Sequence, residues 1–155
     1  MITQQRLKEL INYDTDTGIF IWKKSGSVAG CLDAEGYKII GIDGKHCKAH
    51  RLAWLYVQGS LPKDQIDHKN GIVGDNRLSN LREATPSQNM HNRKIQSNNS
   101  TGHPGVVKRK NKYGAHIKKN GKRIWLGTYD TIFAASAAYS AASKFLHGEY
   151  SGLCR

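Results

Sequence analysis

Residues 66–89 read IDHKNGIVGDNRLSNLREATPSQN, and this stretch decides the fold of the N-terminal part of the chain. It predicts a brief strand, a tight polar loop rich in Gly, Asn and Asp, a second brief strand and the start of a helix. The helix start is marked by Thr85 as the N-cap, Pro86 directly after it and Gln88 three residues after the cap. We therefore expect Asn89 in the first turn of a helix that follows two short strands.

Three side chains of this stretch combine the groups that hydrolysis of a phosphodiester requires. Asp67 and Asn89 carry hard oxygen atoms of the kind that bind a divalent cation, and they are the expected metal ligands. His68 is the expected base, because an imidazole has an ordinary pKa of about 6.5. Neighbouring residues on a regular strand point to opposite faces, so Asp67 and His68 share one site only if the strand ends or distorts at that pair.

The blocks DHKNG, GDNR and SNLR within residues 67–82, with Asn89 downstream, resemble the ββα-metal motif of HNH homing endonucleases in an H-N-N version. The resemblance implies one divalent metal ion, Mg²⁺ or alternatively Mn²⁺, on Asp67 and Asn89. It implies His68 as the general base and Asn80 as the residue whose amide braces the loop. It also implies endonucleolytic cleavage of double-stranded DNA, a homing role and a bacteriophage source. Asn89 stands where many members have His.

The likeness extends upstream of this motif. The block AHRLAW at residues 49–54 resembles the H-R-L-V block of phage-type members, and YDTDTGIFIW at residues 13–22 is similar to their N-terminal region. Together the match spans about the first 95 residues. We identify His50, Arg51 and Arg77 as candidate DNA contacts, with an active-site role, helix capping or packing as the alternatives for His50.

The other elements of this part follow from apolar periodicity and turn residues. Thr3 is expected to cap a helix with an apolar face at Leu7, Leu10 and Ile11. Strands of a small antiparallel sheet are expected at residues 19–22, 37–42 and 45–49. A second helix is expected at residues 50–57. Asp75 and Asn76 are expected to be turn formers, because their side chains satisfy backbone groups in loops.

A polar, turn-prone stretch at residues 95–105 is the expected domain boundary, because it contains no apolar periodicity to bury. The resulting organisation is a nuclease domain over residues 1–97, with the ββα-metal motif at about residues 64–95, a linker over residues 98–104 and a second domain over residues 105–155.

The second domain is expected to form three antiparallel strands at residues 105–109, 113–118 and 123–126, with Asn120-Gly121 as a type I′ hairpin turn. A helix over residues 132–146 should lie across this sheet. The apolar stripe expected to face the sheet consists of Phe133, Ala137, Ala138, Ala141 and Phe145. The predicted fold class is therefore α+β, with a small ββα-metal nuclease domain and a three-stranded antiparallel sheet packed by one helix.

Residues 105–142 resemble the APETALA2-type DNA-binding domain, in which a sheet face binds DNA. The residues that match DNA contacts of that family are Arg109, Tyr113, Lys118, Arg123 and Trp125. Val107 replaces an arginine common there. For Trp125, packing against the helix is the alternative. The residues assigned to the core are Leu126, Phe133 and Tyr139.

The charge distribution favours a polyanionic partner. The formal net charge is +12, and residues 100–155 carry ten Lys or Arg against two acidic residues. No apolar run approaches the length of a membrane span, and the amphipathic N-terminus does not resemble a signal peptide, so we expect a soluble, intracellular protein without membrane contact. If the protein is phage-encoded, that location is the host cytoplasm. Nothing in the sequence implies a protein partner.

Two other functions fit part of the pattern. A catalytically silent DNA-binding regulator would keep the nuclease scaffold, although the intact Asp67, His68 and Asn89 count against it. An enzyme acting on RNA would carry a similar net charge. The APETALA2-like domain favours double-stranded DNA over RNA.

Overall fold

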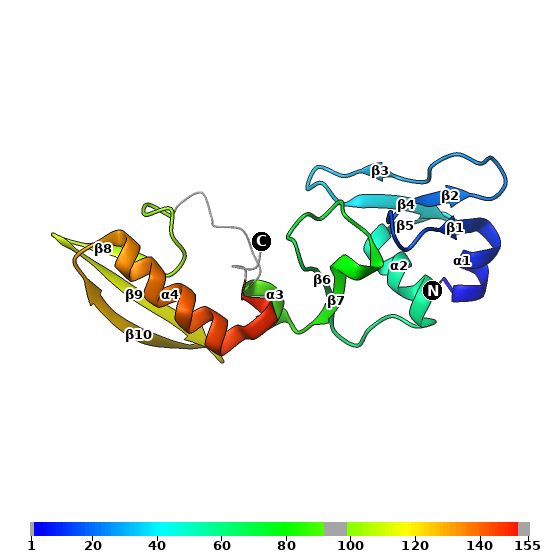
Figure 1. The fold of residues 1–155 in the computed structure, drawn as a ribbon. Helices are drawn as coiled ribbons and strands as arrows, with labels where there is room; N and C mark the ends of the chain where they lie inside the picture. The colour runs from blue at the N-terminus through cyan, green and yellow to red at the C-terminus, as the bar shows by residue number, and fades with distance from the viewer. Residues whose placement is uncertain (1, 92–98, 152–155) are drawn as a thin grey trace. The chain divides into compact units, whose positions relative to one another are not determined.

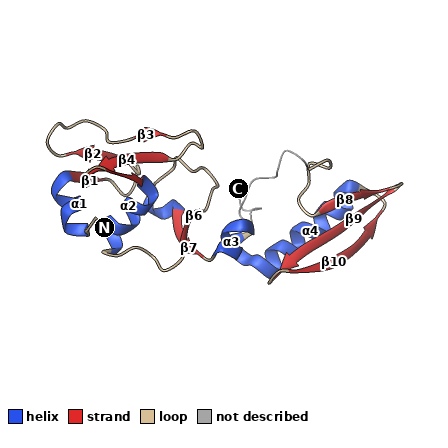
Figure 2. Ribbon diagram, turned by 180° about the vertical axis from the view of Figure 1, so that it is seen from behind, coloured by secondary structure: helices blue, strands red, loops and turns tan. Residues whose placement is uncertain are grey.

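The computed structural model describes residues 2–91 and 99–151, and the chain divides into two compact units, Met1–Pro86 and Ser87–Arg155 (Figure 1). Both units combine helices with antiparallel sheets (Figure 2), which confirms the predicted α+β class. The predicted linker begins at residue 98, which lies with residues 92–97 outside the described residues. Each unit is treated below by itself.

The first unit opens with helix α1, Gln4–Leu10, and the hydroxyl of Thr3 accepts a hydrogen bond from the backbone N–H of Arg6 as an N-cap. Ile11, expected on the apolar face of this helix, instead begins strand β1, Ile11–Tyr13. Ile11 is β-branched and fully buried in its strand, so tertiary packing overrides the helical spacing at this position.

Strand β1 pairs with β2, Phe20–Trp22, in a two-stranded antiparallel sheet. A second, three-stranded sheet has the order β3-β4-β5, with β3 at Cys31–Leu32, β4 at Lys38–Ile42 and β5 at Lys45–Lys48. The expected single sheet is therefore two sheets. An isolated bridge pairs Ile21 of β2 with Val28, which lies between β2 and β3. Helix α2, Ala49–Gln58, follows β5 directly and ends at Gly59, which has the left-handed conformation typical of a helix end.

One hydrophobic core holds these elements together. Its most buried side chains come from α1, β1, β2, β4 and α2, namely Leu7, Ile11, Phe20, Ile40 and Leu52. The same core includes Ile66 and Leu81 from the strands that follow α2. The helical and sheet elements before residue 60 thus provide a fixed base for the ββα segment.

The ββα segment consists of β6 (Gln65–His68), a loop with the 3-10 turn η1 (Leu78–Asn80), β7 (Leu81–Ala84) and α3 (Pro86–His91). The two strands pair antiparallel, with Asp67 opposite Arg82 and His68 opposite Leu81. Strand β6 ends at His68, and a turn follows at once, since the N–H of Gly71 donates to the His68 carbonyl over 2.8 Å. The strand therefore ends directly after the Asp67–His68 pair, and both residues are still paired with β7.

The second unit contains the sheet β10-β9-β8 and helix α4. The strands are β8 (Val106–Arg109), β9 (Lys112–Lys119) and β10 (Lys122–Tyr129), and the helices are α4 (Ile132–His147) and the short 3-10 turn η2 (Gly148–Tyr150). Asn120 and Gly121 both have positive φ angles, 51° and 76°, as a type I′ hairpin turn requires. Helix α4 lies across one face of the sheet in both views (Figures 1 and 2).

The face of α4 that packs on the sheet differs from the predicted one. Phe133 and Phe145 are 77% and 88% exposed, whereas Ala135 and Ser143 are buried. Phe133 is therefore not a core residue, and the stripe predicted to face the sheet faces away from it. Within residues 2–91 and 99–151, no helix, including the apolar α4, is long and apolar enough to cross a bilayer.

Candidate active site

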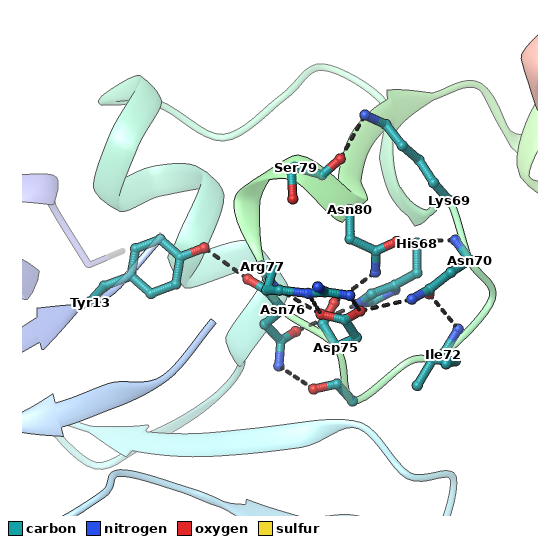
Figure 3. A network of polar contacts seen from close by, with 11 residues as sticks. Tyr13, His68, Lys69, Asn70, Ile72, Asp75, Asn76, Arg77, Ser79 and Asn80 are labelled. Atoms are coloured by element: carbon teal, nitrogen blue, oxygen red, sulfur yellow. Dashed lines mark hydrogen bonds and ion pairs between the residues drawn. The ribbon is translucent and has the colours of Figure 1, made fainter. Parts of the chain in front are cut away.

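The loop between β6 and β7 is closed by the side-chain amide of Asn80, which bonds to both of its halves (Figure 3). Its Oδ1 accepts from the backbone N–H of Asn70 over 3.0 Å, and its Nδ2 donates to the carbonyl of Asp75 over 2.8 Å. Lys69 Nζ adds a bond of 2.7 Å to the carbonyl of Ser79. A buried amide with both ends engaged is costly to replace, so Asn80 holds the two halves of the loop together.

Arg77 forms an ion pair with Asp75 within the same loop. Its Nε and Nη2 donate to the two carboxylate oxygens of Asp75 over 2.8 and 2.6 Å. The hydrogen bonds from the Arg77 side chain are the main reason that the pKa of Asp75 is lowered to about 2. Arg77, a predicted DNA contact, is thus held by Asp75, with half of its side chain exposed to solvent.

The N-terminal hairpin supports the loop from outside. The hydroxyl of Tyr13 donates to the carbonyl of Asn76 over 2.8 Å, and burial raises the pKa of Tyr13 to about 12. Gly18 lies so close to this loop that an added Cβ would approach the backbone N of Arg77 to 2.5 Å, and Gly18 also has a positive φ of 72°. The backbone between β1 and β2 therefore rests directly on the loop.

His68 is buried at the end of β6, with its Nε2 atom 3.5 Å from Oδ1 of Asn76. The orientation of that amide is set by its other end, because Asn76 Nδ2 donates to the carbonyl of Gly74 over 3.1 Å. Burial lowers the pKa of His68, while the contact with Asn76 and the charge of Asp67 oppose this effect. The His68 imidazole is therefore neutral at neutral pH.

Asp67 is buried and lies across the ladder from Arg82, which is buried as well. The Nε and Nη2 atoms of Arg82 donate to Oδ2 of Asp67 over 2.9 and 2.7 Å. Arg82 thereby compensates the charge of the carboxylate and fixes its rotamer. This contact combines opposite charges with directional hydrogen bonds, the geometry in which a buried pair is tolerated.

His50 and Arg51, two predicted DNA contacts, begin helix α2 but have different surroundings. His50 is only 7% exposed, and its ring contacts those of Tyr37 and His68. Burial, followed by the nearby charges of His68, Lys48 and Arg51, lowers the pKa of His50 to about 3. Arg51 is exposed. The buried position of His50 is that of a packing residue, one of the alternatives that the sequence left open, and a contact between His50 and DNA stays a prediction.

Asn89 lies in the short helix α3, which begins at Pro86 as the sequence predicts, and its side chain is half-buried. The residues from 87 onward belong to the second unit, so the approach of Asn89 to Asp67 stays a prediction. Among the described residues, no three His, Cys, Asp or Glu side chains cluster as metal ligands would. The predicted ligands are one carboxylate and one carboxamide, so they would not form a cluster of this kind.

The outer face of the sheet in the second unit, turned away from α4, is basic. Alternation along paired strands places on this face Arg109, Lys112, His116, Lys118, Arg123 and Trp125. Four of the five predicted DNA contacts are among them. The fifth, Tyr113, lies on the opposite side of β9, where it packs against the core with Tyr129. Leu126 packs against the same core, as predicted.

Trp125 lies flat on this outer face. An added Cβ at Gly114 would overlap the Trp125 ring, so only glycine leaves room for the indole there. The guanidinium of Arg109 stacks over the same ring at 4.8 Å from its centroid, and Trp125 remains 45% exposed. The indole is therefore presented to solvent beside a cation, and it does not pack against the helix.

Sequence reasoning assigned no part in the candidate site to three residues that contact it. Asn76 is predicted as a turn former, and its Nδ2 does bond to the carbonyl of Gly74, but its side-chain oxygen also faces His68. Arg82 was noted only as the end of the SNLR block, and Tyr37 only as a strand residue. The sequence did contain a signal for the position of Arg82. When a loop joins two antiparallel strands, the last residues of the first strand lie opposite the first residues of the second strand.

The chain matches one protein family over part of its length. Residues 47–91 match the family of HNH endonucleases, a range that includes His50, Asp67, His68, Arg82 and Asn89. The matched residues contain the whole ββα segment and α2.

Individual proteins are similar to longer parts of the chain. L560, an HNH endonuclease of Acanthamoeba polyphaga mimivirus that is described as uncharacterized, is 34% identical over 122 residues, which are 77% of this chain and 63% of L560. The chain thus spans somewhat under two thirds of this relative's length. An AP2/ERF and B3 domain-containing transcription factor of Arabidopsis thaliana is 37% identical over 70 residues, which are 44% of this chain and 20% of that protein.

A solved structure of the HNH homing endonuclease I-HmuI, titled for DNA binding and cleavage, is 29% identical. It aligns with a TM-score of 0.46 over 54% of this chain and 51% of that chain.

Proposed function

We propose that this protein is a metal-dependent endonuclease that hydrolyses phosphodiester bonds in double-stranded DNA, in the manner of homing nucleases. The observation that carries the proposal is the position of His68: a buried, neutral imidazole at the end of β6, beside Asp67, within the residues that match HNH endonucleases. A neutral histidine next to an acidic side chain is a suitable base for activating water.

The surroundings of His68 favour one tautomer. Because Oδ1 of Asn76 can only accept, its contact with Nε2 of His68 favours the form in which Nε2 carries the proton. The lone pair of the neutral ring then lies on Nδ1. We infer that Nδ1 takes the proton of the attacking water and that Asn76 stabilises the resulting imidazolium through Nε2.

The residues of the proposed metal site fit a hard divalent cation. The Asp67 carboxylate and the Asn89 carboxamide are oxygen donors, and Mg²⁺ is commonly held by one or two protein ligands, with water and phosphate oxygens completing its shell. We propose these two residues as the ligands and Mg²⁺ as the ion, with Mn²⁺ as the alternative. When bound, the ion would supply positive charge to the scissile phosphate and to the departing oxygen.

Arg82 prepares Asp67 for this role. Two of its guanidinium hydrogen bonds reach Oδ2 and restrict the orientation of the carboxylate relative to the β6–β7 ladder. The loop braced by Asn80 then connects the two strands rigidly. By likeness to HNH enzymes, water attacks the phosphate and leaves 5′-phosphate and 3′-hydroxyl ends without a covalent enzyme intermediate.

The second unit supplies affinity in this proposal. Arg109, Lys118 and Arg123 carry positive charge on one sheet face, and the exposed Trp125 offers an apolar surface beside them. A two- or three-stranded ribbon of this kind fits the major groove of B-form DNA. Arg51 in the first unit is a further candidate contact to phosphate.

The test is cleavage of supercoiled plasmid by the wild-type protein and by His68→Ala, each with Mg²⁺ and with a chelator. The matched control is His46→Ala, which removes an exposed histidine of β5. Wild type and His46→Ala should cut with Mg²⁺ only, and His68→Ala should not. Undiminished cutting by His68→Ala would remove His68 as the base. Absence of cutting by wild type, with retained DNA binding, would favour a catalytically silent regulator.

A further inference from the structure

Three aromatic rings from separate parts of the first unit meet at the proposed base. His68 ends β6, His50 lies in the first turn of α2, and Tyr37 immediately precedes β4. The centroids of the His50 and His68 rings are 5.0 Å apart with an interplanar angle of 81°, an edge-to-face contact. The Tyr37 ring lies 5.5 Å from that of His50 and 6.2 Å from that of His68. We call these three residues the ring cluster.

We propose that His50 is a positioning residue for the nuclease reaction, which holds the ring of His68 in its working orientation with Tyr37 as a second support. The inference rests on the proposed function, since it assigns His50 a role through the base. It also replaces the surface contact to DNA that the sequence suggested for His50.

His68 needs such a support because of its place in the chain. It is the last residue of its strand, and a turn begins at its carbonyl. Its contact with Asn76 spans 3.5 Å, at the long limit of a hydrogen bond, and a bond of this length constrains the ring weakly. An edge-to-face neighbour limits rotation about the side-chain bonds by filling the space beside the ring.

The two supporting rings are themselves anchored. His50 stands between Ala49 and Arg51 on a helix whose Ala49, Leu52 and Ala53 are buried in the core. The backbone of Tyr37 is bonded in both directions to Asp33: its N–H donates to the Asp33 carboxylate and its carbonyl accepts from the Asp33 N–H, each over 2.8 Å. Lys48 Nζ also lies 3.7 Å from the centroid of the Tyr37 ring.

The chemistry of His50 suits support rather than catalysis or DNA contact. At 7% exposure its ring offers little surface to a phosphate. Burial keeps its pKa at about 3, so it remains neutral while His68 gains a proton in the reaction and adds no repulsive charge beside it. Tyr37 lies outside the residues that match the HNH family, so the segment that leads into β4 also contributes to the site.

The experiment compares His50→Phe, which keeps an aromatic ring and removes the nitrogens, with His50→Asn, which keeps polarity and removes the ring. For full-length protein with Mg²⁺ on a duplex substrate, His50→Asn should lower kcat by about tenfold to a hundredfold with little change in KM, whereas His50→Phe should retain kcat within about threefold. His46→Asn is the matched control and should match wild type.

Three outcomes would overturn the proposal. Equal losses of kcat in both variants would show that a nitrogen of His50 is required. A rise in KM with unchanged kcat would assign His50 to DNA contact. An unchanged kcat in His50→Asn would remove any role in positioning.

A second measurement does not depend on cleavage. NMR relaxation of the ring carbons of His68, recorded without metal, should show a more mobile ring in His50→Asn than in wild type or His50→Phe. Equal ring mobility in all three proteins would overturn the proposal, even if kcat changes. If wild type cuts no DNA, the proposed function fails and the ring mobility still tests the packing. If His50→Asn does not fold, Tyr37→Leu replaces it, with a loosened His68 ring as the expected result and an unchanged ring as the contrary one.

Discussion

Arg82 directs two hydrogen bonds from one guanidinium to a single oxygen of Asp67, and both side chains are buried in the β6–β7 ladder. The pair lies directly across the two strands, next to His68. A buried carboxylate that loses such a partner retains its desolvation cost without the compensating charge. Arg82 therefore stabilises the fold and orients the proposed metal ligand at the same time.

We predict that Arg82→Leu lowers the free energy of unfolding by about 3 kcal/mol or more, because removing one partner of a buried ion pair leaves the other charge uncompensated. Urea denaturation of the wild type and variant measures the difference. The double variant Arg82→Leu with Asp67→Leu should recover part of the loss, since both charges are then gone. If the single variant is as stable as wild type, the ion pair does not hold the ladder.

The local ββα motif could be predicted from the sequence because its signals lie within a few residues of each other. The Thr85-Pro86 helix start and the glycine-rich loop specify their own conformations. The supports of the site could not be predicted in this way. Tyr13 reaches Asn76 across 63 residues, and Arg82 reaches Asp67 across 15. Such pairs depend on the tertiary packing of the first unit, which no local pattern specifies.

The wrong face of α4 has a different physical cause. Apolar periodicity identifies a buried face only when the other faces are polar, and this helix carries alanines on several sides. The sheet accepts the small side chain of Ala135, which lets the helix approach closely, and the bulky Phe133 and Phe145 point outward. The size of the side chains, and not their hydrophobicity, determines which face of α4 packs on the sheet.

This exposure leads to a prediction on stability. Phe133→Ser and Phe145→Ser should each change the free energy of unfolding by less than about 0.5 kcal/mol, because exposed side chains lose little contact. Ile117→Ala, in the buried face of β9, should cost about 2–5 kcal/mol as the comparison. Thermal or urea unfolding measures all three. A loss at Phe133 as large as that at Ile117 would contradict the described packing of α4.

The contact between Asn76 and His68 predicts a shift in the dependence of cleavage on pH. Asn76→Asp places a carboxylate where the amide oxygen lies, and a negative charge favours the imidazolium form, so the pKa of His68 should rise. Because the base must be neutral, the acidic limb of the kcat profile should move upward by about one pH unit or more. A profile unchanged in Asn76→Asp, with cleavage retained, would mean that Asn76 does not act on His68.

The pKa of His50 predicts how stability depends on acidity. Its folded-state pKa, about 3, lies below the ordinary value, so the unfolded chain binds a proton first as the pH falls. The stability that this neutral residue contributes is present above about pH 6.5 and is lost as the pH falls from there toward 3, by roughly 1 kcal/mol per pH unit. His50→Phe should reduce this slope. Equal slopes in urea titrations of both proteins between about pH 4 and about pH 7 would contradict the assignment.

The basic sheet face predicts how DNA binding depends on salt. Each phosphate contact by Lys or Arg releases condensed counterions, so removing two contacts should reduce the slope of log K against log salt by about 2. We expect this reduction for the double variant Lys118→Ala with Arg123→Ala, whose side chains are exposed and neighbours in the β9–β10 pair. Lys144→Ala, which removes an exposed charge from helix α4 in the same unit, is the control. Fluorescence anisotropy of a labelled duplex over a salt series gives the slopes. If Lys144→Ala lowers the slope and the double variant does not, DNA binds the helix side of the unit, and the outer face of the sheet loses its assigned role.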